Sequence, residues 1–135
     1  MDGRGRSLRL GAHGERRAQL MRRGEIRLFD LYPVRGSEAN KRRPAVIVSN
    51  DGANSTATWL GRGVVTVVPV TSSTDRVYPF QVLLPASGTG LDRDSKAQAE
   101  QVRSVDVERV GTLVGVVAPA ILASLDEALR LHLAL

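Results

Sequence analysis

The sequence contains no cysteine and only two histidines, at positions 13 and 132. The absence of cysteine excludes disulfides, thiolate zinc sites and cysteine nucleophiles, and two histidines are too few for a histidine-rich metal centre. A long hydrophobic run is also missing. The longest uncharged segment, 110–125, is interrupted by two glycines and a proline, and it is shorter than the about 20 residues that a membrane helix needs. We therefore expect a soluble, cytoplasmic protein with no membrane partner.

The chain has 135 residues, of which 42% are hydrophobic and 24% charged, which is typical of one globular domain. Its formal net charge of +5 is unevenly distributed. Residues 1–20 carry +3 and residues 21–43 carry +4, whereas residues 44–135 carry −2. A local basic edge of this kind suits a polyanion such as nucleic acid, although a solvated basic loop explains the charge equally well.

The first twenty residues differ from the rest of the chain. They contain four glycines, show no helical or strand period and lack the apolar core of a secretory signal. We interpret residues 1–20 as a flexible N-terminal extension, with Met21 as the candidate for the true translation start. The folded domain is expected to span residues 21–135.

Short strands dominate the remainder. Strands are expected at 25–31, 45–49, 64–70, 80–84, 96–102 and 113–117. The polar connection 50–63 is expected to hold one helical turn at 53–58, and Ser104 is expected to cap a short helix over 105–110. Pro119 suits the first turn of a helix that runs to about Leu133, with an apolar face at 122, 125, 129 and 133. This pattern predicts a mostly β, α+β fold: a small barrel of short antiparallel strands with a C-terminal amphipathic helix.

Two strongly β-branched segments, 44–50 and 64–70, fix a candidate site. Antiparallel pairing centred on their connection places residue 50 opposite 64 and Arg43 opposite Thr71. Both side chains then lie at one sheet edge, between the polar loops 32–43 and 72–79. The alternative is that Arg43 only solvates a strand end and Thr71 only caps a turn.

Five short motifs occur in order at suitable spacing: GEI at 24–26, GSE at 36–38, RPAVIVSND at 43–51, VPVTS at 68–72 and EQVRSVD at 100–106. Together they resemble the MazF/PemK toxins, which are sequence-specific endoribonucleases of bacterial toxin–antitoxin modules. The resemblance covers about residues 21–135. It implies an SH3-like barrel, a symmetric homodimer, metal- and cofactor-independent cleavage of single-stranded RNA, and a MazE-like antitoxin whose acidic, apolar tail occupies the basic groove.

The resemblance also implies that Arg43 and Thr71 are the catalytic pair. In such a reaction a ribose 2′-OH attacks the adjacent phosphate, giving a 2′,3′-cyclic phosphate and a 5′-hydroxyl. A guanidinium matches the non-bridging oxygens on which charge builds, and a hydroxyl donor completes the clamp. A guanidinium is a poor general base, so Arg43 is expected to stabilise charge, and to be a candidate leaving-group acid.

Further residues are expected to contact RNA, some through the resemblance and some through their charge. They are Ser37, Glu38, Lys41, Arg42, Ser72, Arg76 and Gln101. Lys41 and Arg42 are expected to bind phosphates, and Glu38 is the nearest candidate for the unassigned general base. The loop 72–79 is expected to provide base selectivity, with Arg76 and Tyr78 able to stack. Gln101 reads a base edge or is a polar residue on a solvent-facing strand, and Tyr78 is alternatively a core anchor.

Two rival functions remain at this level. A CcdB-like gyrase poison shares the fold without catalysis, but this chain ends in LHLAL rather than in a Trp-Gly-Ile type tail. An inactive RNA- or antitoxin-binding module is the other rival, and the retention of both Arg43 and Thr71 speaks against it. Trp59 is expected to pack or to anchor a loop, and Arg27 stands where family members often carry an aromatic residue.

Overall fold

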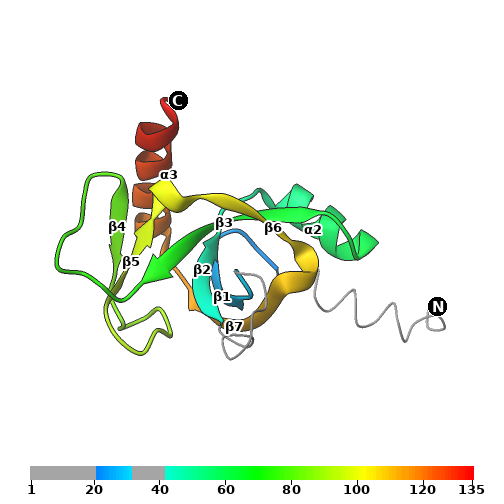
Figure 1. Ribbon diagram of the computed structural model, residues 1–135, viewed down its shortest axis with the longest axis horizontal. Coiled ribbons are helices and arrows are strands. Elements are labelled where there is room, and N and C mark those ends of the chain that lie inside the picture. Colours follow the sequence, from blue (N-terminus) through cyan, green and yellow to red (C-terminus); the bar gives the residue numbers. More distant parts are fainter. Residues whose placement is uncertain (1–20, 32–41) are drawn as a thin grey trace.

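A computed structural model describes residues 21–31 and 42–135 of the chain (Figure 1). Its strands are β1 (Glu25–Phe29), β2 (Arg43–Ile47), β3 (Val64–Thr71), β4 (Gln81–Leu84), β5 (Ser95–Gln98), β6 (Arg103–Asp106) and β7 (Val110–Val116). Its helices are α2 (Asp51–Leu60) and α3 (Pro119–Leu133), with two 3-10 turns, η2 (Ala99–Gln101) and η3 (Val107–Arg109).

These strands form one seven-stranded sheet, and the pairings among them are antiparallel. The order is β4-β5-β3-β2-β1-β7, and β6 pairs with the first half of β3. β1, β2, β6 and β7 curl around a common interior, while α3 stands against the β4–β5 end (Figure 1). In the described part of the chain no ladder joins the outer strands, so the sheet is curled but not closed. The predicted antiparallel α+β fold with a C-terminal helix is confirmed.

The central strands are buried on both faces, as the β-branched run at 45–49 predicts. Alternate residues of β2 enter different clusters: Ala45 and Ile47 join one with Phe29, whereas Val46 joins the other with Leu125. The first cluster fills the curled interior beneath α2, and the second lies under α3. Alternation with a period of two therefore sends the side chains of one strand into two cores.

Helix α2 is longer than the predicted single turn. It spans ten residues, and its N-terminus is capped by the Asn50 side chain, which accepts a hydrogen bond from the Ala53 N–H at 2.8 Å. Gly61 ends the helix in the left-handed conformation at φ 70°. The buried Asn54 amide donates to the Ser49 carbonyl at 2.9 Å, which fixes the helix against the end of β2. The expectation of one helical turn at 53–58 was therefore too short, because the helix covers residues 51–60.

The C-terminal helix has the predicted bounds, Pro119–Leu133, with Leu125 buried, Leu122 and Leu129 half-buried and Leu133 48% exposed. The prediction of a helix over 105–110 capped by Ser104 was wrong. Residues 103–106 form β6 on β3, and Asp106 rather than Ser104 caps the short turn η3 by accepting from the Glu108 N–H at 2.9 Å. Alternating Val105 and Val107, both buried, suit a strand edge better than a helical face.

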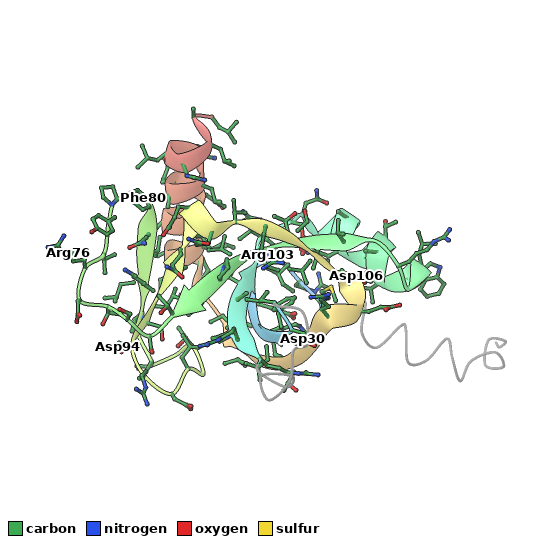
Figure 2. The ribbon with its side chains drawn as sticks, in the orientation of Figure 1. Asp30, Arg76, Phe80, Asp94, Arg103 and Asp106 are labelled. Carbon is green, nitrogen blue, oxygen red and sulfur yellow. The ribbon has the colours of Figure 1, made fainter. Side chains whose placement is uncertain are left out.

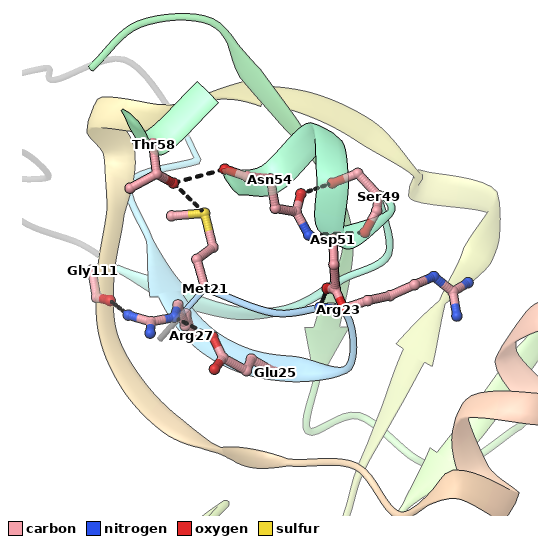
Figure 3. Close-up of polar contacts among 9 residues, drawn as sticks. All are labelled: Met21, Arg23, Glu25, Arg27, Ser49, Asp51, Asn54, Thr58 and Gly111. Carbon is pink, nitrogen blue, oxygen red and sulfur yellow. Dashed lines mark hydrogen bonds and ion pairs between the residues drawn. The ribbon is translucent and has the colours of Figure 1, made fainter. Parts of the chain in front are cut away.

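A buried ion pair lies on β1 (Figure 3). The Arg27 Nε donates to Glu25 Oε1 at 2.8 Å, and both side chains are less than 10% exposed. Arg27 Nη1 also donates to the Gly111 carbonyl of β7 at 2.9 Å. Arg27 is therefore a buried link between β1 and β7.

Among the described residues, no helix is both long and apolar enough to cross a membrane.

Candidate active site

The ladder between β2 and β3 brings the predicted pair together. It pairs Ala45 with Pro69, Val46 with Val68 and Ile47 with Val67. Continuing this register by two residues places Arg43 opposite Thr71, as the sequence predicts. Beyond Ile47 the register is lost. The amides of Val48 and Ser49 both donate to the Thr66 carbonyl, at 2.9 and 3.3 Å. The predicted pairing of 50 with 64 was therefore wrong.

Arg43 and Thr71 open into one cavity of about 550 Å³, a size usual for a ligand site. The strand ends contribute Leu28, Pro44 and Val70 to its lining, and β7 contributes Leu113 and Val114. Apolar strand residues thus line the cavity together with Arg43 and Thr71. A charged group bound there is held by Arg43 and Thr71 against a partly apolar wall.

The hydroxyl of Thr71 is oriented by the turn that follows β3. Its Oγ1 accepts a hydrogen bond from the Ser73 N–H at 3.2 Å. A hydroxyl that accepts from the backbone keeps its own hydrogen for a further acceptor. Thr71 is half-buried and Arg43 is exposed, and both line the cavity, so an anion bound there has both donors on its boundary. This geometry suits an anion that carries several oxygens.

A second wall of the cavity is the connection 85–94 between β4 and β5. Gly90, Leu91, Asp92 and Arg93 of this segment line the cavity, followed by Ser95 of β5. The connection is pressed against β7: a Cβ on Gly90 would lie 2.1 Å from the Val114 carbonyl oxygen, and one on Gly115 would lie 1.9 Å from the Thr89 carbonyl oxygen. Two glycines at these positions are the sequence signal of that contact.

Of the predicted groove between loops 32–43 and 72–79, residues 32–41 lie outside the described residues, so that groove stays a prediction. In the described part of the chain, only Ser72 from the loop 72–79 lines the cavity, together with Arg43 from the other loop. Ser37, Glu38 and Lys41 lie outside the described residues. Arg42 is exposed and its guanidinium lies over β7, with Nη1 2.5 Å from the place of a Cβ on Gly111. Arg42 does not line the cavity.

Arg76 and Gln101 are also away from the cavity lining. Arg76 Nη1 donates to the Tyr78 hydroxyl at 3.3 Å, and the Tyr78 ring stacks on Phe80 with centroids 5.4 Å apart. Figure 2 places Arg76 and Phe80 beside β4, with Asp94 at the other end of that hairpin. Tyr78 is 42% exposed, so it is not a core anchor. Gln101 is exposed in η2 rather than on a solvent-facing strand.

Trp59 is 63% exposed on α2. It lines a shallow hollow with Ser55, Thr56 and Leu60, none of which borders the Arg43 cavity. The expectation that Trp59 packs or anchors a loop was wrong. In the described ranges, no three acidic or histidine side chains gather closely enough to hold a metal ion.

The chain is similar to known proteins in sequence and in fold. The family profile described as "PemK-like, MazF-like toxin of type II toxin-antitoxin system" matches residues 22–133. The chain is 67% identical to endoribonuclease MazF9 of Mycobacterium tuberculosis over 114 residues, which cover 84% of this chain and 97% of the relative. It is 32% identical to endoribonuclease MazF of Staphylococcus epidermidis over 117 residues, 86% of this chain and 93% of the relative. A MazE–MazF crystal structure from Deinococcus radiodurans is similar with a TM-score of 0.65 at 25% identity, covering 85% of this chain and 96% of that chain.

Proposed function

Because the chain belongs to the PemK-like, MazF-like family of toxins of type II toxin–antitoxin systems, we propose that it cleaves single-stranded RNA at the cavity shared by Arg43 and Thr71. Both relatives named above are endoribonucleases, and RNA cleavage is the activity of this toxin. What is proposed here is which residues carry out the cleavage and by which chemical steps it proceeds.

In the proposed reaction the 2′-oxygen of a ribose attacks the adjacent phosphorus, and the bond from phosphorus to the 5′-oxygen of the next nucleotide breaks. The products are a 2′,3′-cyclic phosphate and a 5′-hydroxyl. The 2′-hydroxyl proton passes to a base that is still unassigned, and Glu38 remains the candidate. Arg43 is the candidate donor of the proton that the leaving 5′-oxygen takes up.

Arg43 and Thr71 stabilise the charge that builds on the non-bridging phosphate oxygens. The guanidinium offers two parallel N–H groups to those oxygens, and the Thr71 hydroxyl offers a third donor beside them. Donors that already surround the developing charge need no reorganisation during the reaction, which is why one such group is worth about 10²–10³ in rate. The observation that carries the proposal is the common opening of both side chains into one cavity.

The proposed partners follow from the family. A MazE-like antitoxin is the proposed inhibitor, since a solved relative is a MazE–MazF complex. Its acidic, apolar tail would compete with RNA for Arg43. We also propose a homodimer, and a cytoplasmic location, where the RNA substrate is present.

The test uses purified protein, mixed RNA with EDTA, and oligonucleotides that carry a 2′-deoxy sugar at the cleavage site. We expect cleavage with EDTA, none at the deoxy position, and a loss of about 10²–10³ in kcat for Arg43→Ala. Arg62→Ala is the matched control, because Arg62 is exposed and does not line the cavity.

Three outcomes would contradict the proposal. Cleavage of the deoxy substrate would reject attack by the 2′-oxygen, and full activity of Arg43→Ala would reject the assigned residue. Inhibition of gyrase without cleavage of any RNA would favour the CcdB-like alternative.

A further inference from the structure

We propose that Arg93 binds an RNA phosphate next to the one that is cleaved, so that the connection 85–94 provides affinity while Arg43 and Thr71 provide chemistry. This inference rests on the proposed function. It assigns a role to a residue that the motifs of the family resemblance do not include.

Arg93 is the second guanidinium of the cavity. It is exposed, and from the connection 85–94 it lines the same cavity of about 550 Å³ as Arg43 and Thr71. Within residues 21–31 and 42–135, its side chain makes no hydrogen bond or ion pair. A charged group at the border of a ligand cavity that is not engaged by the described chain suits a ligand of the opposite sign.

The backbone that carries Arg93 is held by contacts that do not use its side chain. The Arg93 carbonyl accepts from the Ser95 hydroxyl at 3.0 Å, and the Asp94 carboxylate accepts from the Ala86 N–H at 2.8 Å. The buried Thr89 hydroxyl donates to the Pro85 carbonyl at 2.6 Å. Gly90 adds the close contact with β7. The guanidinium is thus presented by a fixed loop, which lowers the entropy lost when a ligand binds.

Of the two charged side chains that line this wall, Arg93 is the one that attracts a phosphate. Successive phosphates follow one another along single-stranded RNA, so a strand gripped at Arg43 brings a neighbouring phosphate to the cavity wall. Asp92 also lines the wall, and its carboxylate repels phosphate, which leaves Arg93 as the attractive group there. Phosphate contacts set position and affinity without reading sequence.

The test compares Arg93→Gln with Arg62→Gln, an exposed arginine outside the cavity. We measure kcat and KM on an RNA oligonucleotide. The dissociation constant of the same oligonucleotide with a 2′-deoxy sugar at the cleavage site, which cannot be cut, is measured over a range of salt concentrations. For Arg93→Gln we expect KM and the dissociation constant to rise about tenfold with kcat unchanged, as loss of a charge-assisted contact predicts.

The salt dependence identifies the contact as a phosphate. For single-stranded nucleic acid, the slope of log K against log salt should fall in magnitude by about 0.7 when one phosphate contact is lost. Arg93→Lys keeps the charge and should restore most of this slope. Arg62→Gln should leave affinity and slope at the wild-type values.

An unchanged dissociation constant and slope for Arg93→Gln would overturn the inference. A fall in kcat at constant KM would also overturn it, because that result places Arg93 in the chemistry. The binding measurement separates the two proposals: a wild-type protein that binds the uncut oligonucleotide through Arg93 but cleaves no RNA contradicts the proposed function only.

Discussion

Arg43 and Thr71 reach the cavity from the ends of two hydrogen-bonded strands, whereas Arg93 reaches it from a connection without regular secondary structure. The wall that carries Arg43 and Thr71 is positioned by a ladder of three residue pairs between β2 and β3. The second wall is set by a glycine contact between two stretches of backbone that are far apart in sequence.

The comparison shows that two different interactions, strand hydrogen bonds and close backbone packing, can form the walls of one cavity. Ladder hydrogen bonds fix the distance between neighbouring strands, so the reacting groups are held at the spacing of the sheet. Close packing at Gly90 and Gly115 fixes the other wall only while no side chain intrudes. The proposed chemistry therefore lies on the wall that the ladder holds, and the proposed affinity on the wall that single substitutions can move.

The largest expected effect is a loss of stability that involves both walls, because it acts through β1. Strand β1 pairs with β2 on one side and with β7 on the other, and it carries the buried Glu25–Arg27 ion pair. Glu25→Gln leaves the Arg27 charge buried without its partner, which we expect to lower the free energy of unfolding by about 3–5 kcal/mol. Urea denaturation checks this, with Glu127→Gln of an exposed pair on α3 as the control. Loss of less than about 1 kcal/mol would show that the pair contributes little to holding the walls together.

The next effect should be confined to the ladder wall, which is the wall formed by Arg43 and Thr71 on the β2–β3 ladder. Thr71→Val keeps the shape of the side chain and removes its hydroxyl, so we expect kcat to fall by about 10²–10³ with little change in KM. Steady-state kinetics on an RNA oligonucleotide checks this. Thr56→Val, on the exposed side of α2, is the matched control. A rise in KM alone would mean that Thr71 binds RNA without taking part in the chemistry.

The connection wall, formed by residues 85–94, can be tested with two single glycine substitutions. Gly88 and Gly90 have φ angles of 82° and 81°, but a Cβ on Gly88 meets nothing within 4 Å, whereas one on Gly90 meets the Val114 carbonyl at 2.1 Å. Both changes to alanine carry the strain of a positive φ, about 1 kcal/mol. Only Gly90→Ala should also displace Arg93 and raise KM, by up to about tenfold. Thermal melting and kinetics on both variants check this, and equal KM values would show that the glycine contact does not position Arg93.

The smallest expected effect lies outside both walls. Asn50→Ala removes the cap of α2, and we expect it to lower the free energy of unfolding by about 1 kcal/mol. No residue of α2 lines the cavity, so kcat and KM should stay at their wild-type values. A change in KM without a change in kcat would link α2 to RNA binding. It would also contradict the conclusion that the two walls alone form the site.

The ladder wall was accessible from the sequence because two β-branched runs flank a single connection. Once antiparallel pairing is assumed, counting from that connection gives the register that places Arg43 opposite Thr71. The same count failed at residues 50 and 64, because the amides of both Val48 and Ser49 bond to one carbonyl. A local irregularity of this kind has no signature in hydrophobic alternation.

Other features were missed for identifiable reasons. The residues of α2, DGANSTATWL, include weak helix formers, although Asn50 and Gly61 are recognisable as cap residues. Arg93 was missed because its wall depends on contacts between Thr89, Gly90 and β7, which no local pattern reveals. Trp59 was expected to pack because tryptophan usually does, yet its helix turns it towards solvent.

The doubled hydrogen bond at the Thr66 carbonyl has a consequence for how this chain can vary. It ends the β2–β3 register before α2 begins. Within 51–60 the helix α2 is fixed by its buried residues Asn54, Ala57 and Thr58, so the turn at 61–62 is the part of this segment that can change in length. Such a change lies beyond the paired residues of β2 and should leave the spacing of Arg43 and Thr71 intact.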